Sequence, residues 1–306
     1  MSIFRRGLLA AGLAVAVAGA LGVVGVVATV QAAGPGGPPA LLPWGAKPRL
    51  IEKAGSWASR PVPKYAPKGR GAPPAPPSGA MAADGKYVYL YATGRQDAEV
   101  DGVAALLTVA RPLVGPADRH SLAEVAVQSA DTQQAVEVGW TVDRLTNGDE
   151  ATHLFVYHWV DGKETCYNGC GFVPYPGASI VPGAALTVDV TQQFGIQHFN
   201  GAWWLGYGTE WIGSFPDDIW KGKFTRTGIV QVYGEVTAAS TTPCTQMGNG
   251  KKPTDPTDTT TAKIGSVTYV NGPAVALKIS ATSPLLYPTF ASTTGRGFVY
   301  GGPGRC

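Results

Sequence analysis

The feature that most limits the fold is the alternation of short apolar segments with Asn-Gly turns. All five asparagines of the 306-residue chain are followed directly by glycine. Asn-Gly tolerates the positive φ angles of a type I′ turn, so it favours hairpins. Alternating, β-branched or aromatic segments predict strands over Tyr87–Ala92, Ala104–Val109, Ala123–Ser129, Ala135–Asp143, His153–Trp159, Ala185–Val190, Trp203–Tyr207 and Ile229–Thr237. The pattern predicts an all-β antiparallel sandwich or jelly roll without long helices.

The N-terminus predicts export. Arg5 and Arg6 precede an apolar run over residues 7–30 that only Thr29 interrupts, and small residues follow at Ala32 and Ala33. This order is typical of a cleaved signal peptide, here residues 1–32, and of a secreted protein. The alternative is an uncleaved membrane anchor, because the run is long enough to span a bilayer. No second apolar span follows, so we expect no membrane contact once the signal is removed.

Residues 33–80 form a segment rich in proline, glycine and basic side chains, with a proline run over 72–77. Such a composition predicts extended, partly polyproline-like chain instead of helix or sheet. The segment is either a plain linker or a propeptide that is removed. The remaining residues, 81–306, are the predicted folded domain.

The charge is divided unevenly along the chain. Residues 1–79 hold nine basic residues and one acidic residue, and the whole chain carries +3, so the remainder carries −5. A weakly acidic domain has no basic surface for nucleic acid, and we expect no such partner.

Four cysteines in an exported chain predict two disulfides. Three pairings are possible, and we favour Cys166–Cys170, which closes a tight loop, together with Cys244–Cys306, which ties down the last residue. A metal site is the weaker alternative, because no histidine lies at ligand spacing from the cysteines. No metal and no cofactor are expected.

Motifs of common catalytic classes are missing from the sequence: Gly-x-Ser-x-Gly, His-Glu-x-x-His, the P-loop and Gly-x-Gly-x-x-Gly before a helix. The four histidines are scattered. His158 lies between Tyr157 and Trp159 in a predicted strand, which favours packing over catalysis.

Glu137 and Glu235 are the candidate catalytic residues. Successive side chains of a strand point to opposite faces, so each glutamate lies opposite its strand's aliphatic stripe. Gly139 and Gly234 lie close by and would permit strand curvature or close approach of a ligand. The pattern alone favours the alternative, two solvated surface glutamates.

The domain resembles the neprosin family of proline-specific glutamic endopeptidases. The resemblance rests on the order and spacing of Ser121–Val127, Val136–Val142, Leu154–Gly162, Cys166–Val173, Trp203–Leu205, Ile212–Pro216, Tyr233–Val236, Thr245–Gly250 and Tyr300–Cys306. It implies a curved antiparallel β-sandwich and a catalytic pair of Glu137, in the Glu-x-Gly-Trp strand, and Glu235, in the Gly-Glu-Val strand. It also supports both favoured disulfides. Tyr233 replaces a glycine of the family pattern, and the segment before the domain is shorter than in plant members.

The implied reaction is cleavage on the C-terminal side of proline at acid pH. Two nearby carboxylates do not both ionise readily, so one takes a proton from water while the protonated one polarises the carbonyl. Which glutamate is the base is undecided. Gln231, Tyr233 and Trp140 are candidates for substrate contact, although Trp140 is on the apolar face and fits the core better. The expected partners are proline-containing peptides, and the expected state is a monomer.

Two other functions fit the same residues. A β-jelly-roll glycoside hydrolase also uses two carboxylates, one with a raised pKa. A secreted carbohydrate- or surface-binding module would use the glutamates as hydrogen-bond acceptors without turnover.

Overall fold

The computed structural model describes residues 36–49 and 87–306. The predicted signal peptide 1–32, the proline run 72–77 and the predicted domain start at residue 81 lie outside the described residues. Within the described ranges, no helix is long and apolar enough to cross a membrane.

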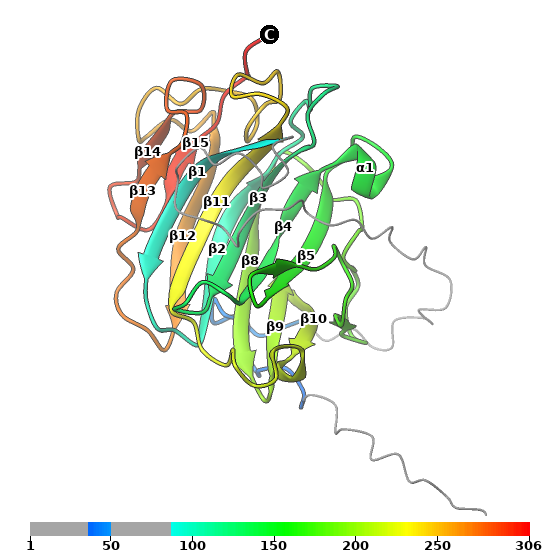
Figure 1. Ribbon diagram of the computed structural model, residues 1–306. Coiled ribbons are helices and arrows are strands. Elements are labelled where there is room, and N and C mark those ends of the chain that lie inside the picture. The colour runs from blue at the N-terminus through cyan, green and yellow to red at the C-terminus, as the bar shows by residue number, and fades with distance from the viewer. Residues whose placement is uncertain (1–35, 50–86) are drawn as a thin grey trace, which may run out of the picture. The chain divides into compact units, whose positions relative to one another are not determined.

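Two antiparallel sheets pack face to face (Figure 1), which confirms the all-β sandwich. Sheet A has the order β13 (Lys278–Ala281), β1 (Val88–Asp97), β11 (Ile229–Ala238), β3 (His120–Gln128), β4 (Ala135–Val142), β5 (His153–Val160) and β6 (Lys163–Glu164). Sheet B has the order β14 (Thr289–Ala291), β15 (Phe298–Tyr300), β12 (Ala262–Val270), β2 (Gly102–Val109), β8 (Val190–Phe199), β9 (Ala202–Tyr207), β10 (Glu210–Pro216) and β7 (Val173–Pro174). The described helices are one turn each, α1 (Arg144–Asn147) and the 3-10 helix η2 (Asp217–Trp220).

The core lies between the inner faces of the sheets and follows from strand alternation. In β4, Val136, Val138 and Trp140 point inward and are fully buried, and Val103 and Leu107 of β2 approach from sheet B. Burying such side chains contributes about 1.5–3 kcal/mol each. The inner faces are therefore committed to packing, and polar chemistry is left to the outer faces.

Seven of the eight predicted strands are present within a few residues of their predicted bounds. The prediction over Ala185–Val190 is wrong, because Ala185 makes only an isolated bridge to His153. The strand in this region is β8, which begins at Val190 and opens with the polar run Thr-Gln-Gln. Its polar start concealed it from a reading based on apolar alternation.

One of the five Asn-Gly pairs closes a two-residue hairpin. Asn200 and Gly201 connect β8 to β9 with φ angles of 48° and 76°, as a type I′ turn requires. Asn147 instead ends α1, where Gly148 adopts the left-handed C-cap conformation. The remaining pairs lie in longer loops. Asn-Gly therefore indicated where the chain turns, but it closed a two-residue hairpin only at Asn200 and Gly201.

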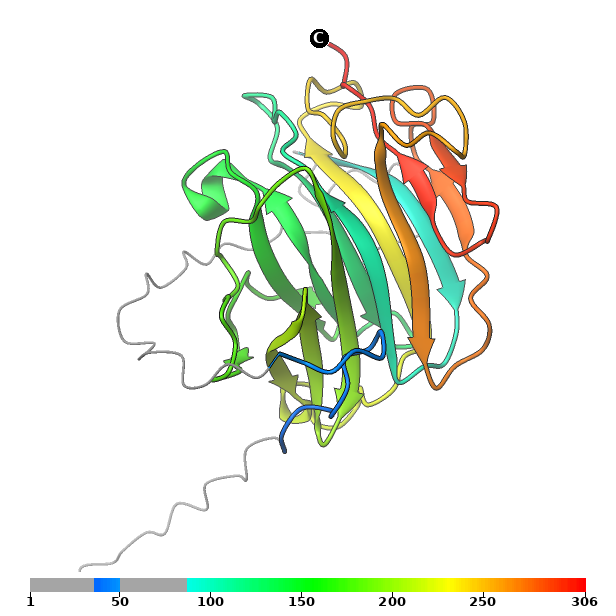
Figure 2. The same cartoon turned by 180° about the vertical axis from the view of Figure 1, so that it is seen from behind.

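Residues 36–49, here called the N-terminal strap, pack on the outer face of sheet B (Figure 2). Leu42 is 2% exposed, and the indole of Trp44 covers the cross-strand pair Gly195 and Gly206. A Cβ at Gly206 would lie 3.1 Å from the Trp44 ring, so glycine keeps this floor flat. The strap has no helix or strand of its own and takes its order from these contacts.

Both favoured disulfides are present, Cys166–Cys170 and Cys244–Cys306. The first closes a loop against the open edge of β5, where Asn168 exchanges hydrogen bonds with Val156: its N donates to the Val156 O (3.0 Å), and its Oδ1 accepts from the Val156 N (3.1 Å). The second spans 62 residues of sequence and fixes the C-terminus. The first disulfide therefore helps to hold a loop beside the face of sheet A that carries the candidate glutamates.

Candidate active site

The outer face of sheet A, here called the glutamate face, carries three acidic side chains. Glu137 of β4 and Glu235 of β11 point to this face as predicted, and Glu124 of β3 joins them. All three are at most 2% exposed. Buried carboxylates are costly unless they are paired or hydrogen-bonded, so this cluster is a functional-site candidate on physical grounds.

Strand register puts Glu124 between the two predicted residues. Glu137 pairs with Ala126 of β3, whereas Glu235 pairs with Leu122, so one strand and four residues separate them. With strand spacings of about 4.8 Å and rises of about 3.3 Å per residue, their Cα atoms would lie about 16 Å apart in a flat sheet. The same arithmetic puts Glu124 about 8 Å from each. The three carboxylates thus form a diagonal row instead of an adjacent pair.

Tyr233 lies in the middle of this row, directly opposite Glu124. Its hydroxyl donates a hydrogen bond to Glu124 Oε1. Burial raises the pKa of Tyr233 well above its ordinary value of 10, and the charges of Glu124, Glu137 and Glu235 raise it further. Tyr233 is therefore a neutral hydrogen-bond donor among the three acidic groups.

Glu137 accepts a hydrogen bond from a neutral donor, the indole Nε1 of Trp159 on β5 (2.7 Å). Gln231 of β11 lies directly across β3 from Glu137, and its Nε2 donates to Gln128 Oε1 (2.9 Å). The small side chain of Ala126 lies between Glu137 and Gln231. Gln231 and Tyr233, both predicted to contact substrate, are thus on the glutamate face.

Glu235 has a different partner, a histidine. His120 Nε2 lies 2.7 Å from Glu235 Oε1, and Thr237 Oγ1 lies 3.0 Å from each of these two atoms. The His120 side chain is fully buried. No local pattern could have indicated this contact, because 115 residues separate His120 from Glu235 in the chain.

Asp143 stands behind His120, with its Oδ2 3.7 Å from His120 Nδ1 and 3.3 Å from Arg119 Nε. Its other oxygen caps α1 by accepting from the backbone N–H groups of Leu145 and Thr146. Burial would raise the pKa of Asp143, but the charges of His120 and Arg119 hold it well below its ordinary range. Asp143 is therefore an ionised carboxylate that is held in place.

The pKa of His120 reflects these two carboxylates. Burial by itself lowers it, but the contacts with Asp143 and Glu235 outweigh burial and raise it above the ordinary value of 6.5. His120 thus favours the imidazolium form, with a carboxylate on either side.

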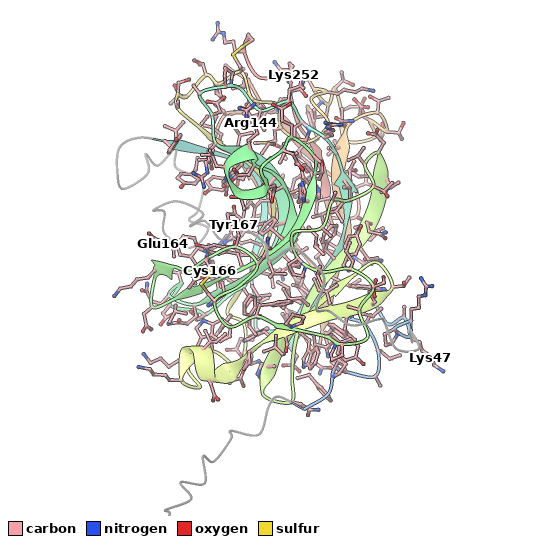
Figure 3. The ribbon with its side chains drawn as sticks, turned by 90° about the vertical axis from the view of Figure 1, so that its right-hand side faces the viewer. Lys47, Arg144, Glu164, Cys166, Tyr167 and Lys252 are labelled. Carbon is pink, nitrogen blue, oxygen red and sulfur yellow. A yellow bond between two sulfur atoms is a disulfide. The ribbon has the colours of Figure 1, made fainter. Side chains whose placement is uncertain are left out.

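Aromatic rings line the glutamate face beside the carboxylates. Tyr167, held by the Cys166–Cys170 loop, packs edge-on against Phe155 and Tyr157 of β5. Tyr91 of β1 packs edge-on against Tyr233 from the other side. In Figure 3, Tyr167 and Cys166 lie on one side of the sandwich and Lys47 of the strap lies on the opposite side. The face therefore combines buried acids with flat apolar surfaces.

Two candidate residues lie elsewhere. Trp140, a candidate for substrate contact, is fully buried in the core and donates its Nε1–H to the carbonyl of Thr108 (2.9 Å). Alternation points it away from Glu137, so its candidacy as a substrate contact is corrected. His158 packs on Phe215 with ring centroids 4.5 Å apart, and burial lowers its pKa to about 4. Packing, the favoured interpretation of His158, matches this environment.

The two glycines near the glutamates accommodate protein and not ligand. A Cβ at Gly139 would lie 2.7 Å from the Cβ of Glu124, its cross-strand neighbour on the glutamate face. Gly234 points to the core, where a Cβ would lie 2.9 Å from Cδ2 of the Tyr300 ring. Gly139 therefore lets β3 and β4 bring two glutamates together on one face.

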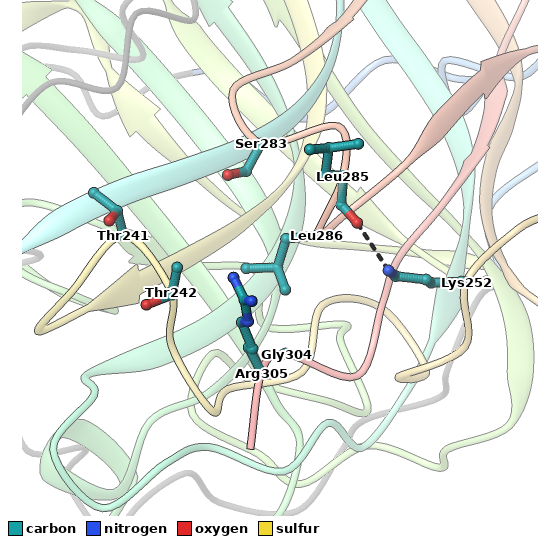
Figure 4. Close-up of a pocket in the computed structure, with 8 residues that line it drawn as sticks. All are labelled: Thr241, Thr242, Lys252, Ser283, Leu285, Leu286, Gly304 and Arg305. Atoms are coloured by element: carbon teal, nitrogen blue, oxygen red, sulfur yellow. Dashed lines mark hydrogen bonds between the residues drawn. The ribbon is translucent and has the colours of Figure 1, made fainter.

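A surface hollow of about 460 Å³ lies near the C-terminus (Figure 4), away from these residues. It is lined by Thr241, Thr242, Lys252, Ser283, Leu285, Leu286, Gly304 and Arg305. In the described ranges, no group of three or more His, Cys, Asp or Glu side chains is arranged to hold a metal ion.

Fold and site together define a two-sheet β-sandwich with a buried carboxylate cluster on one outer face. Residues 117–303, more than half of the chain, match the family model described as Neprosin. The chain belongs to the Neprosin family.

Solved structures with similar folds include proteins of several activities. Scytalido-glutamic peptidase, solved with a peptide-based transition-state analogue, is 10% identical over 70% of this chain and 98% of its own, with a TM-score of 0.34. The carbohydrate-binding module CBM66 from Bacillus subtilis is 7% identical over 57% and 92%, with a TM-score of 0.29. A family 16 endo-glucanase from Bacteroides ovatus is 5% identical over 50% and 68%, with a TM-score of 0.31. Likenesses this weak say nothing about the substrate of this chain.

Proposed function

We propose that this protein is a secreted glutamic-type endopeptidase that cleaves peptides on the C-terminal side of proline at acid pH. The observation that carries the proposal is the buried row of Glu137, Glu124 and Glu235 around the neutral hydroxyl of Tyr233. Membership of the Neprosin family supports the same reaction class. The N-terminal apolar run supports export.

The proposed chemistry uses carboxylates in opposite protonation states. An ionised glutamate takes a proton from the attacking water, and a protonated one passes a proton to the leaving nitrogen. Because Glu124 lies between Glu137 and Glu235, proton sharing is expected between neighbours in the row instead of directly between its ends. Tyr233 would stabilise negative charge that develops on the substrate carbonyl.

The aromatic rings offer a reason for preferring proline. Tyr157 and Tyr167 present flat apolar surfaces beside Glu137. A proline ring is rigid and apolar and packs well on such surfaces, while the adjacent glutamates act on the following peptide bond. The proposed subsite is therefore the aromatic part of the glutamate face next to β5.

Access to this face requires a rearrangement, because the three carboxylates are at most 2% exposed in the full-length chain. We propose that cleavage between residues 50 and 80, within the predicted propeptide, is the activating step. The proposal predicts that the form cut between residues 50 and 80, here called the shortened form, is active and that the full-length chain has little activity.

The test is to incubate the shortened, secreted protein at pH 3–7 with a proline-containing peptide, the same peptide with alanine at that position, and a glucan. Cleavage only after proline supports the proposal. Sugar release would favour a glycoside hydrolase, and binding without turnover would favour a binding module; either result would reject it.

Isosteric variants test the residues. Glu137→Gln and Glu235→Gln should each lower kcat/KM by about 10²-fold or more, because general acid–base groups contribute that much. Glu210→Gln is the matched control: Glu210 of β10 is also buried, but it belongs to sheet B, where it binds Ser179 and pairs with Tyr207, which packs against the core. Full activity in either site variant would remove that residue from the mechanism.

A further inference from the structure

Glu137 and Glu235 lie in chemically different surroundings although both belong to one row. Among the residues that the structure describes, Glu137 accepts from the neutral indole of Trp159, whereas Glu235 contacts the imidazole of His120 at 2.7 Å. Enzymes separate the roles of two carboxylates by such differences in environment. The pair is therefore asymmetric, and the asymmetry comes from a residue outside it.

We propose that His120 is a positioning residue that, as an imidazolium with Asp143 on its other side, keeps Glu235 ionised and oriented, so that Glu235 takes the proton from water and a protonated neighbour in the row supplies the acid. This inference rests on the proposed peptidase function and assigns roles within it. His120 lies beside Glu235 on the same face of sheet A and acts through it, with its Nε2 2.7 Å from Glu235 Oε1.

The contacts of the Glu235 carboxylate also hold it in position. Among the described residues, Oε1 of Glu235 contacts His120 Nε2 at 2.7 Å and Thr237 Oγ1 at 3.0 Å. His120 and Thr237 are themselves cross-strand partners in the register of β3 and β11. Two contacts from two strands therefore hold one oxygen of Glu235 in place.

Groups on every adjoining element bear on the charge of His120. Glu235 comes from β11, Asp143 follows β4, and Arg119 directly precedes His120. On β1, Tyr89 is the cross-strand partner of Thr237. Arg119 opposes protonation of His120, but it pairs with Asp143 at 3.3 Å, and the two carboxylates lie close enough to outweigh it.

The charge of His120 sets the direction of the pH effect. His120 is protonated below its raised pKa, so it carries a positive charge throughout the acid range in which the enzyme is proposed to work. A cation in contact with a carboxylate lowers the carboxylate pKa by about 1–3 units. Glu235 therefore stays a base at pH values where an isolated buried glutamate would be protonated.

The first test is the pH profile of His120→Gln, which keeps a hydrogen-bond donor and removes the charge. The acid limb of kcat/KM should move to higher pH by about one unit or more. Activity below the limb should fall by about tenfold or more, with a smaller change on the plateau. His198→Gln is the matched control, since His198 forms a 2.9 Å pair with Asp217 away from the glutamate face. A uniform loss with an unmoved acid limb would overturn the proposal.

The second test needs neither activity nor a folded His120 variant. NMR titration of the histidine ring signals in the wild-type protein should give His120 a pKa above 6.5, and in Glu235→Gln this value should fall. An unchanged value in Glu235→Gln would overturn the proposal even if the protein cleaves no peptide. If the pKa of His120 falls in Glu235→Gln but the wild-type protein cleaves no peptide, the His120–Glu235 ion pair is supported and only the proposed function is rejected.

Discussion

Gly139 is the position where one added methyl group should disturb the glutamate face most directly. A Cβ there would lie 2.7 Å from Cβ and 2.8 Å from Cα of Glu124, whereas ordinary contacts lie at 3.4–4 Å. In Gly139→Ala, β3 and β4 must therefore move apart locally by roughly 1 Å. Glu124 and Glu137 lie on those two strands and would move with them.

The expected magnitudes follow from overpacking and from misplacement. Overpacking of this kind costs about 1–3 kcal/mol, and each kcal/mol lowers Tm by about 2–4 °C in a domain of this size. A displacement of about 1 Å at a reacting group costs about 10²-fold in rate. Gly139→Ala should thus melt several degrees lower and lose most of its kcat/KM.

Thermal unfolding followed by circular dichroism gives the first number, and cleavage of a proline peptide at acid pH gives the second. Gly265→Ala in β12 is the control, because a Cβ at Gly265 meets no atom within 4 Å. We expect it to change stability by less than about 1 kcal/mol and to leave activity intact. Wild-type Tm and kcat/KM in Gly139→Ala would refute the claim that β3 and β4 require glycine here.

Three further predictions concern the rest of the chain. Cys244→Ser should lower the free energy of unfolding by about 4 kcal/mol, because its disulfide closes a 62-residue span; urea unfolding measures this, and a loss under 1 kcal/mol would contradict the chain-entropy reasoning. When a protease site is inserted between residues 50 and 80 and the chain is cut there, the N-terminal strap should stay bound to the domain during size-exclusion chromatography. Leu42→Ala should release the strap, since Leu42 is buried against sheet B. Acidified wild-type protein should yield a lower-mass form cut near Pro77; identical maturation of Glu137→Gln, seen by mass spectrometry, would exclude self-processing.

Local patterns in the sequence were sufficient for seven strands, β1 to β5, β9 and β11, and for the face that their side chains take. Alternation within one strand put Glu137 opposite Trp140, and the structure has one on the outer face and the other in the core. Alternation is a property of neighbouring residues, so it survives without knowledge of the partner strands. It failed for β8, where polar residues open the strand.

The predicted linker or propeptide contains an ordered part, residues 36–49, that composition could not distinguish from the rest of the segment. Residues 36–49 share the proline and glycine content of their surroundings, yet Leu42 and Trp44 find a flat floor at Gly195 and Gly206. Whether an extended segment is ordered depends on the surface it meets. That surface is formed by strands about 150 residues further along the chain.

By itself, the sequence determined an all-β sandwich, two disulfides and two glutamates on non-aliphatic faces. Only the tertiary structure decided that Glu124 lies between those glutamates and that His120, with Asp143 behind it, contacts one of them. The physical reason is register. Alternation fixes the face on which a side chain lies, but pairing between strands more than 100 residues apart fixes its neighbours.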